Sequence, residues 1–388
     1  MALPKLMLPK LILAGTFVAL TSLAGLPGTE QARAEDVYKI GVSAGLSGYV
    51  ASLDRPWRDG LEVAVAYVNA KGGIMGRKVQ LIIEDNKSEP EGAFIAYRKM
   101  ISSDKVDIFL SGCLSAGNFA AAPFVVHAKI PMVLCSILPP PDQVEWAYSV
   151  LPSTRFEVEA RLEYLKSRTQ IREAGVLYDP SPYATIQKDI ATRITQAYGI
   201  EIPVVDTYKQ DDADISPQIS KINAAGLKAL VKMGAGRPTL TVAKDIRQLG
   251  LDTLLLASPD DFAVLKPAAE LLGEQFLFVA MPAQIYESLP DGPLRQEIGR
   301  FLAHWRDKYG DRDPGWGARA WDAVMLTAAA VEKAKSFEGP KVRDALETLT
   351  EFQGTTGVYH FSPAVHQGIT QNPYLMATIV GGKVQVRR

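Results

Sequence analysis

Two features of the sequence predict an α/β fold of two doubly wound lobes, each built on a parallel sheet. First, β-rich segments alternate with helical segments of about 10 to 16 residues, and parallel strands need such helical crossovers. Second, this alternation runs from residue 37 to about 150 and starts again near residue 157. A chain of 388 residues is also longer than a single hydrophobic core usually supports.

The first run of alternation has clear boundary signals. The segment 37–44 is β-rich and ends in a glycine-containing turn. In the helix that follows, apolar residues recur at spacings of three and four from Trp57 to Val68, and Gly72 and Gly73 end it. The other elements predicted here are strands at 79–84, 106–110, 132–135 and 147–150, and helices at 89–102 and 116–127.

The second run repeats the pattern, and the tail then departs from it. The predicted strands are 174–178, 202–207, 227–232, 253–257 and 276–280. A helix at 157–168 precedes the first of them, and helices at 183–197, 216–225 and 239–249 lie between them. The tail has helices at 292–309, 316–336 and 341–349 and β-rich segments at 357–361, 375–380 and 384–386. We expect the long tail helices to return and cover the first lobe.

The N-terminus predicts export. Lys5 and Lys10 precede an apolar run over 11–26, and Ala32-Arg33-Ala34 offers the small residues that a signal peptidase reads. The run is shorter than the roughly 20 residues that span a bilayer. We therefore expect residues 1–34 to be a signal peptide, cleaved before Glu35, and the protein to work in the periplasm. No later stretch reaches spanning length.

Composition narrows the class of partner. Hydrophobic residues make up 47% of the chain and charged residues 22%, with a net charge of -1, which favours neither disorder nor a nucleic-acid surface. We expect a monomer.

Cys113 and Cys135 are the only cysteines; they could form a disulfide in an oxidising compartment or remain free and buried.

Polar residues that follow the predicted strands are the candidates for a binding site. Ligands of open α/β sheets bind beyond the carboxyl ends of the strands, where helix N-termini point outward. Ser115 follows the third strand and Ser136 the fourth. Ser115 could hold a carboxylate, or Ser115 or Asn118 could simply cap the next helix. No nucleophile, metal-ligand spacing or dinucleotide fingerprint is present, so we expect no enzyme, no metal and no cofactor.

Three segments resemble a known family. The run Val68-Asn-Ala-Lys-Gly-Gly-Ile-Met-Gly-Arg-Lys-Val79 resembles the opening of the leucine/isoleucine/valine-type solute-binding proteins of ABC transporters. Ala320-Trp-Asp-Ala-Val324 is similar to the family's aromatic-Asp-Ala helix, and Gly354-Thr-Thr-Gly357 to its late strand start. The resemblance covers nearly the whole chain after the leader.

This resemblance implies a type I periplasmic binding fold, with two lobes joined by three crossing segments that form a hinge. The crossings are expected at 151–156, 281–286 and 352–356. Lobe one would then comprise 35–154 and 286–352, and lobe two 155–285 and 353–388. Such lobes close around a ligand.

The resemblance also implies site residues. Ser115 matches the serine that holds the ligand carboxylate, Ser136 and Leu138 match the contacts after the fourth strand, and Tyr183 matches an aromatic residue early in lobe two. Leu138 departs from the usual Thr or Ser. Arg237 stands where the family often has an aromatic residue, and a guanidinium suits carboxylate recognition. Asp260 or Asp261 could take a ligand ammonium or could cap a helix. Candidate apolar walls, which could equally be core residues, are Tyr49, Trp57, Tyr183 and Trp316.

These expectations give one leading function. The protein would be a periplasmic solute-binding protein that delivers a small carboxylate, either a hydrophobic amino acid or an aromatic or aliphatic carboxylic acid, to an ABC permease. The alternative is a receptor of the same fold that signals to a partner protein.

Overall fold

Residues 37–387 are described by the computed structural model, so the predicted signal peptide lies outside the described residues. Within this range no helix combines the length and the apolar character needed to cross a membrane.

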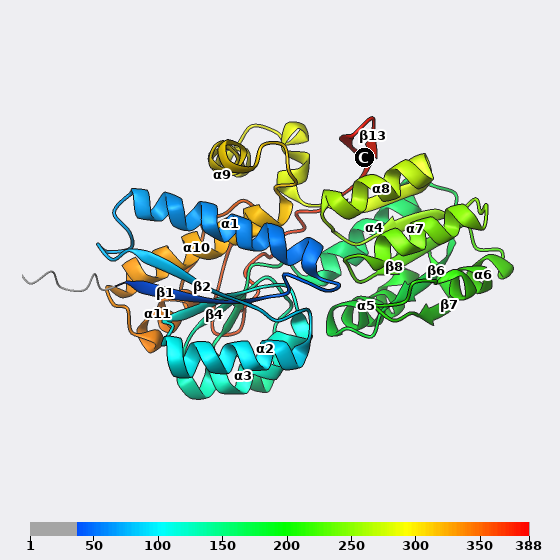
Figure 1. Ribbon diagram of the computed structural model, residues 1–388. Coiled ribbons are helices and arrows are strands. Elements are labelled where there is room, and N and C mark those ends of the chain that lie inside the picture. The colour runs from blue at the N-terminus through cyan, green and yellow to red at the C-terminus, as the bar shows by residue number, and fades with distance from the viewer. Residues whose placement is uncertain (1–36, 388) are drawn as a thin grey trace, which may run out of the picture. The chain divides into compact units, whose positions relative to one another are not determined.

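Five parallel strands form the first sheet, in the order β2-β1-β3-β4-β5. Helices cover both faces, with α1 and α10 on one side and α2 and α3 on the other (Figure 1). The strands are Tyr38–Ala44 (β1), Val79–Asp85 (β2), Ile108–Ser111 (β3), Met132–Leu134 (β4) and Ala147–Ser149 (β5). The helices are Ala51–Ala70 (α1), Pro90–Lys99 (α2), Ser115–Ala128 (α3), Pro293–Tyr309 (α9), Gly315–Ala334 (α10) and Gly339–Glu347 (α11). We call this sheet and these helices lobe one.

Seven strands form the second sheet, in the order β14-β13-β10-β9-β8-β6-β7. Five of them are parallel, and the late strands β13 and β14 join antiparallel. The strands are Glu173–Tyr178 (β6), Glu201–Thr207 (β7), Ala229–Met233 (β8), Leu254–Ala257 (β9), Phe276–Ala280 (β10), Leu375–Val380 (β13) and Lys383–Val386 (β14). The helices are Thr154–Arg168 (α4), Pro182–Tyr198 (α5), Ser216–Ala224 (α6), Pro238–Gln248 (α7) and Phe262–Leu272 (α8). We call this sheet and these helices lobe two.

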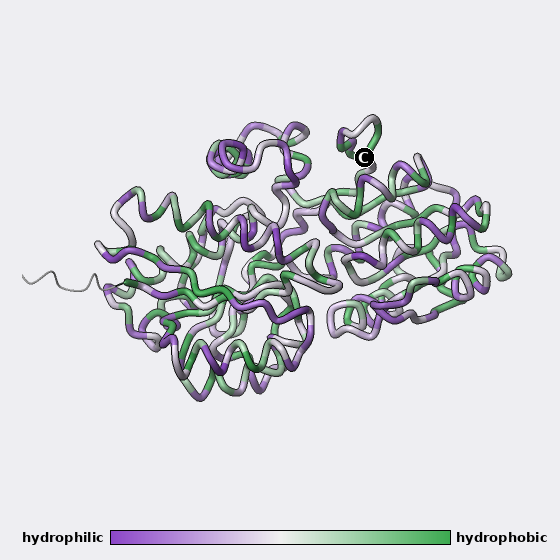
Figure 2. Tube along the Cα trace, in the orientation of Figure 1, coloured by the Kyte–Doolittle hydropathy of each residue, from purple (hydrophilic) through white to green (hydrophobic). Residues whose placement is uncertain are grey.

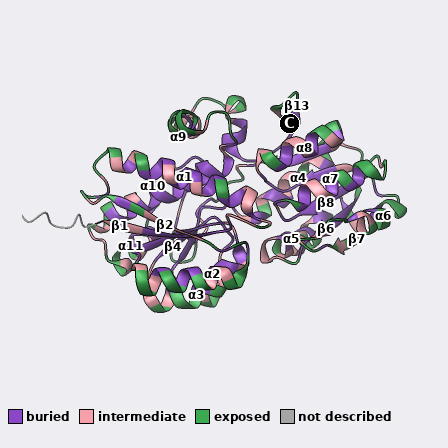
Figure 3. Ribbon diagram, viewed as in Figure 1, coloured by how far each residue is buried: buried purple, intermediate pink, exposed green. Residues whose placement is uncertain are grey.

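Short elements complete the chain. They are a π-helical turn at Met100–Asp104, 3-10 turns at Pro141–Gln143, Gly273–Gln275 and Pro282–Ser288, and the two-stranded ribbon Phe352–Gln353 (β11) with Val358–Tyr359 (β12). The buried residues follow the strands and the inward helix faces, while the outer faces of α2 and α3 are exposed (Figure 3).

Helices α1 and α10 meet at two glycines. A Cβ atom at Gly60 would lie 2.3 Å from the carbonyl oxygen of Gly317. No real Cβ approaches an oxygen so closely, so the two backbones are in direct contact. The contact therefore fixes the separation between the middle of α1 and the first turn of α10.

Two of the motifs on which the family resemblance depends meet in the structure. The buried carboxylate of Asp322 in α10 accepts hydrogen bonds from the backbone N–H groups of Thr355 at 2.7 Å and Thr356 at 3.1 Å. It also accepts one from the Tyr359 hydroxyl at 2.9 Å, and burial raises the pKa of Asp322 to about 6. These contacts fasten the segment that leaves lobe one for β13.

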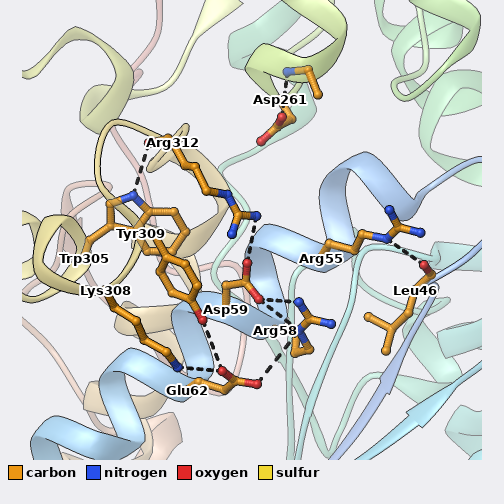
Figure 4. A network of polar contacts seen from close by, with 11 residues as sticks. Leu46, Arg55, Arg58, Asp59, Glu62, Asp261, Trp305, Lys308, Tyr309 and Arg312 are labelled. Atoms are coloured by element: carbon orange, nitrogen blue, oxygen red, sulfur yellow. Dashed lines mark hydrogen bonds and ion pairs between the residues drawn. The ribbon is translucent and has the colours of Figure 1, made fainter.

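Helix α9 is mostly hydrophilic (Figure 2) and is tied to α1 by charged groups (Figure 4). Lys308 and the Tyr309 hydroxyl contact the Glu62 carboxylate at 2.7 and 3.1 Å. Arg312 pairs with the buried Asp59 at 2.9 Å. These contacts tie α1 to the C-terminal end of α9 and to the loop that follows it.

Candidate functional site

A cavity lies where the carboxyl ends of strands from both sheets come together. Its volume is about 40 Å³. A single water molecule needs only about 10–15 Å³ by that measure, so the cavity has room for a small compact molecule. Its walls come from both lobes and are formed by Tyr49, Val50, Leu53, Cys113, Ser115, Ala116, Cys135, Ser136, Leu151, Asp179, Ser181, Tyr183, Ala235 and Trp316.

Direct contacts between the lobes enclose this cavity. The Ser52 hydroxyl in α1 donates a hydrogen bond to Asp260 Oδ1 of lobe two at 3.4 Å. A Cβ atom at Gly236 would lie 2.4 Å from the carbonyl oxygen of Tyr49, and Gly236 has a φ of +86°. Only glycine suits this position, because it combines a left-handed backbone with close approach to the other lobe.

Four helices begin at the cavity wall. Tyr49 and Val50 lie at the start of α1, Ser115 at the start of α3, Tyr183 in the first turn of α5 and Trp316 in the first turn of α10. Each helix N-terminus presents backbone N–H groups and the positive end of a dipole. Together they favour an anionic group in the cavity.

Ser115 has a hydroxyl that the protein leaves available. It is the first residue of α3, and no side chain caps that helix. Within residues 37–387 its hydroxyl makes no hydrogen bond to another protein group, and the residue is only 5% exposed. The helix-cap alternative is therefore not what the structure contains at this position.

Ser136 is held in place by its neighbours. Asn118 Nδ2 donates a hydrogen bond to Ser136 Oγ at 2.9 Å and another to the Gly112 carbonyl at 2.9 Å. Ser136 Oγ donates in turn to the carbonyl of Ile137 at 3.0 Å. Asn118 thus links the loop after β3 to the loop after β4.

The two cysteines form a disulfide between these same loops. The Cα atoms of Cys113 and Cys135 are 4.7 Å apart, and both residues line the cavity. Of the two alternatives that the sequence left open, the structure contains the bridge.

Asp54 is bonded to two loops of lobe one, the loop after β1 and the loop after β3. Its carboxylate accepts hydrogen bonds from the backbone N–H groups of Gly45 and Cys113, each at 2.6 Å. A Cβ atom at Gly112 would lie 2.5 Å from Asp54 Oδ2, so glycine makes room for the carboxylate. Burial raises the pKa of the Asp54 carboxyl to about 7, although the two N–H groups favour the ionised form.

Asp179 places a carboxylate in the cavity wall on the side of lobe two. It is 2% exposed; its Oδ1 accepts from Ser181 N at 2.9 Å and Gln210 Nε2 at 3.2 Å, and its Oδ2 accepts from the Tyr208 hydroxyl at 3.3 Å. Sequence reasoning missed this residue. The signal was present, because Asp179 directly follows β6, as Ser115 follows β3.

Tyr183 lines the cavity with its ring and turns its hydroxyl away. That hydroxyl donates to Glu157 Oε2 at 2.6 Å. Glu157 is completely buried at the start of α4, and burial raises its pKa.

The nine residues predicted from the sequence divide into two groups. Five line the cavity, namely Tyr49, Ser115, Ser136, Tyr183 and Trp316. The other four lie outside its lining. Trp57 is in the core of lobe one and donates to the Leu110 carbonyl at 3.3 Å. Leu138 packs against a buried hydrophobic cluster that includes Tyr97 and Phe109.

The two charged residues of the second group have other surroundings. Arg237 is exposed at the N-cap of α7. Asp260 is buried and accepts hydrogen bonds from Gly236 N at 2.7 Å and from Thr239 Oγ1 at 3.2 Å. Asp261, the other acid considered, accepts from Ala263 N at 2.7 Å and so caps α8.

No metal centre is found in the described part of the chain. Residues 37–387 contain no group of three or more His, Cys, Asp or Glu side chains arranged to hold an ion. The chemistry available at the cavity is therefore that of hydroxyls, helix N-termini, a carboxylate and aromatic rings.

The sequence model of the family described as periplasmic binding protein matches residues 37–383, and this chain belongs to that family. Its fold is the type I periplasmic binding fold, which confirms the prediction.

Two relatives illustrate the similarity in sequence. The chain is 23% identical over 362 residues to the Leu/Ile/Val-binding protein homolog 7 of Brucella suis biovar 1 (strain 1330), covering 88% of each protein. It is 23% identical over 337 residues to the leucine-, isoleucine-, valine-, threonine-, and alanine-binding protein of Pseudomonas aeruginosa, covering 84% of this chain and 85% of the relative.

Two solved structures illustrate the similarity in fold. An extracellular ligand-binding receptor from Rhodopseudomonas palustris HaA2 superposes with a TM-score of 0.81 at 22% identity, covering 90% of this chain and 99% of that chain. The branched-chain amino acid transporter substrate binding protein LivJ from Streptococcus pneumoniae, in complex with isoleucine, gives a TM-score of 0.76 at 21% identity, with coverage of 90% and 99%.

Proposed function

We propose that this protein binds a hydrophobic α-amino acid in the cavity and delivers it to the permease of an ABC transporter. The single observation that carries the choice of ligand is that one wall of the small cavity suits a carboxylate and the opposite wall suits an ammonium group. Lobe one offers the free hydroxyl of Ser115 at a helix N-terminus, which suits a carboxylate. Lobe two offers the buried carboxylate of Asp179, which suits an ammonium group.

Asp179 separates an amino acid from a simple carboxylic acid. In the described part of the chain no Lys, Arg or His nitrogen lies within 4.0 Å of its carboxylate, and the buried Lys232 interacts with it only from farther away. A buried carboxylate without a close cation is costly, and a second carboxylate brought near it would add repulsion. A ligand that carries its own ammonium removes that cost.

The remaining walls set the character of the ligand side chain. Tyr49, Leu53, Leu151, Tyr183 and Trp316 present rings and aliphatic groups. Such a lining favours an apolar side chain, and the small volume favours a compact one. The relatives named for leucine, isoleucine and valine binding support the same class.

Location is part of the proposal. The family name and the predicted signal peptide support a location in the periplasm. The proposed binding residues are Ser115, Ser136, Asp179, Tyr183, Tyr49 and Trp316. The partners are then the amino acid and the permease subunits.

The experiment compares amino acids with carboxylic acids that carry no ammonium group, and L-leucine with 4-methylpentanoate is the pair that differs in that group alone. L-leucine, L-isoleucine, L-valine and L-phenylalanine are titrated by thermal shift and calorimetry beside 4-methylpentanoate and benzoate. A ligand at 100 times its dissociation constant adds about 2.7 kcal/mol of stability. We expect L-leucine to bind at least tenfold more tightly than 4-methylpentanoate, its analogue without the ammonium. Binding of the carboxylates alone would overturn the choice of an amino acid, and binding of neither class would overturn the function.

A further inference from the structure

We propose that the Cys113–Cys135 disulfide is a redox control on this binding site: the oxidised bridge positions the two serine-bearing loops for the ligand, and reduction lowers affinity. The inference rests on the proposed function, because it assigns the bridge a part in binding the amino acid. Both cysteines line the cavity, so the bridge is part of the wall that a ligand would contact.

The bridge joins the two loops that carry the serines. Cys113 lies two residues before Ser115, and Cys135 directly precedes Ser136. The first loop leaves β3, which ends at Ser111, and the second leaves β4, which ends at Leu134. The covalent link therefore lies within two residues of both cavity-lining serines.

The other connections are few and non-covalent. Asn118 donates to Gly112 O and to Ser136 Oγ, each at 2.9 Å, and Cys135 N donates to the carbonyl of Ser111 at 3.0 Å. These hydrogen bonds can keep the loops folded after reduction. They do not fix the separation of the two Cα atoms, now 4.7 Å, as a covalent bond does.

Binding gains from such a constraint. A ligand that must order two loops loses affinity to the entropy of ordering, whereas loops that are already fixed avoid this loss. The bridge closes a segment with a sequence separation of 22 residues, which contains the whole of α3. Reduction releases both ends of this segment at the cavity.

The position of the bridge makes the coupling reciprocal. Both cysteines line the cavity; Cys113 is half-buried and Cys135 is buried. If reduction weakens binding by a given factor, the bound ligand must oppose reduction by the same factor. A bound amino acid would also cover the sulfur atoms and slow the attack of a reductant.

The chemical step is a thiol–disulfide exchange with a dithiol as reductant. A dithiol thiolate attacks one cysteine sulfur, so the Sγ–Sγ bond breaks and the other cysteine leaves as a thiolate. The second thiolate of the reductant then attacks its own sulfur in the mixed disulfide, which forms the cyclic disulfide and releases the first cysteine. Cys113 and Cys135 each gain a proton and become thiols, while the dithiol is oxidised to its cyclic disulfide. Two electrons move in total.

The main experiment measures L-leucine affinity by calorimetry for the oxidised protein, for the protein held in excess dithiothreitol, and for the double variant Cys113→Ala, Cys135→Ala. We expect the dissociation constant to rise roughly tenfold in the last two samples, with circular dichroism unchanged. Saturating L-leucine should lower the midpoint potential of the bridge by about 30 mV for a tenfold coupling. Equal affinity in both redox states would overturn the inference.

A ligand-free measurement keeps this inference separate from the proposed function. Amide hydrogen exchange over residues 112–118 and 135–138 should become faster on reduction, while exchange in the strands of lobe two should not change. Ser115→Ala is the matched control, because it removes the hydroxyl and keeps the bridge: it should weaken binding and leave the exchange of the oxidised protein unaltered. Failure of the oxidised protein to bind any amino acid overturns the function alone, and unchanged exchange on reduction overturns the inference.

Discussion

The hydroxyl of Tyr183 donates a hydrogen bond to the buried carboxylate of Glu157 at 2.6 Å, so one side chain has its ring in the cavity and its polar end beneath it. The other oxygen of Glu157, Oε1, has no partner in the described part of the chain. In that part of the chain the Tyr183 hydroxyl is therefore the one hydrogen-bond donor to the Glu157 carboxylate. The ring of Tyr183 is correspondingly fixed at the cavity wall.

Replacing this tyrosine should cost stability more than affinity. In Tyr183→Phe the Glu157 carboxylate loses the donor at Oε2, and a buried acceptor left without a partner costs roughly 1–3 kcal/mol. Urea unfolding should show a loss in this range, and calorimetry should show a change in ligand affinity of less than about threefold. The control is Tyr164→Phe, on the half-buried surface of α4, which should do neither. A large loss of affinity with unchanged stability would mean that the hydroxyl faces the ligand.

Ser115→Ala should have the opposite profile. Its hydroxyl has no partner in the described protein, so its removal leaves nothing unpaired until a ligand binds. We expect binding to weaken by roughly 1–3 kcal/mol, the usual worth of a hydrogen bond to a charged group, with an unchanged unfolding midpoint. Ser216→Ala, at the first residue of α6 and outside the cavity lining, is the control for affinity, which it should leave unchanged. Unchanged affinity would remove Ser115 from the site.

Asp179→Asn should discriminate between ligands according to charge. The amide keeps an oxygen for Ser181 N and removes the negative charge from the cavity wall. Binding of L-leucine should weaken at least tenfold, whereas binding of 4-methylpentanoate should be unchanged or stronger, because a carboxylate repulsion is lost. Arg237→Met is the control, since Arg237 is exposed outside the cavity lining, and the L-leucine dissociation rate should not change. Faster dissociation from Arg237→Met would bring the guanidinium back to the ligand.

Asp54 should make stability depend on pH in a predictable direction. Its pKa in the folded protein is about 7, above the value of roughly 3.9 in an unfolded chain. Between these values the folded state keeps a proton that the unfolded state has released, so the contribution of Asp54 to stability is largest near pH 4, decreases as the pH rises to about 7, and is constant above.

The variant Asp54→Asn should lack this part of the dependence. Unfolding free energies of the two proteins, measured from pH 4 to pH 8, should diverge in slope by up to about 1.4 kcal/mol per pH unit below pH 7. Asp211→Asn, at an exposed carboxyl, should follow the wild type. Parallel curves for Asp54→Asn and wild type would mean that Asp54 is ionised throughout, as its two N–H donors favour.

Gly60→Ala should strain the contact between α1 and α10. Its Cβ would lie 2.3 Å from the Gly317 carbonyl oxygen, so the helices must separate. Overpacking of this kind costs roughly 1–3 kcal/mol, which outweighs the roughly 0.5–1 kcal/mol that alanine gains over glycine within a helix. Denaturant unfolding measures the difference. Gly299→Ala in α9 is the control, since its nearest neighbour is the end of the Tyr286 side chain at 3.1 Å, and it should be neutral within about 1 kcal/mol.

Local patterns in the sequence were enough to predict the alternating elements. The strand predicted at 227–232 is β8 at Ala229–Met233, and the helix predicted at 316–336 is α10 at Gly315–Ala334. The antiparallel addition of β13 and β14 to the second sheet was not predictable, because strand pairing depends on contacts between distant segments. Helix α1 begins at Ala51, so Trp57 lies in its second turn and faces the core.

Site residues were harder to predict because the direction of a loop decides which side chain reaches the cavity. Ser115 and Arg237 both follow strands, yet only Ser115 lines the cavity. Gly234 and Gly236 have φ values of +89° and +86°, and such a left-handed backbone redirects the residues that follow in a way that residue spacing does not reveal. Trp57 and Trp316 look alike in sequence, and only the fold separates the core residue from the wall residue.

The disulfide also has a consequence for when the exported protein becomes able to bind its ligand. Thiols stay reduced in the cytosol and are oxidised in the periplasm. On the proposal made above, a precursor still in the cytosol would have a weakened site, and amino acids abundant there would stabilise its folded form little by mass action. The chain would then remain easier to unfold for translocation and would acquire full affinity only in the compartment where it captures its cargo.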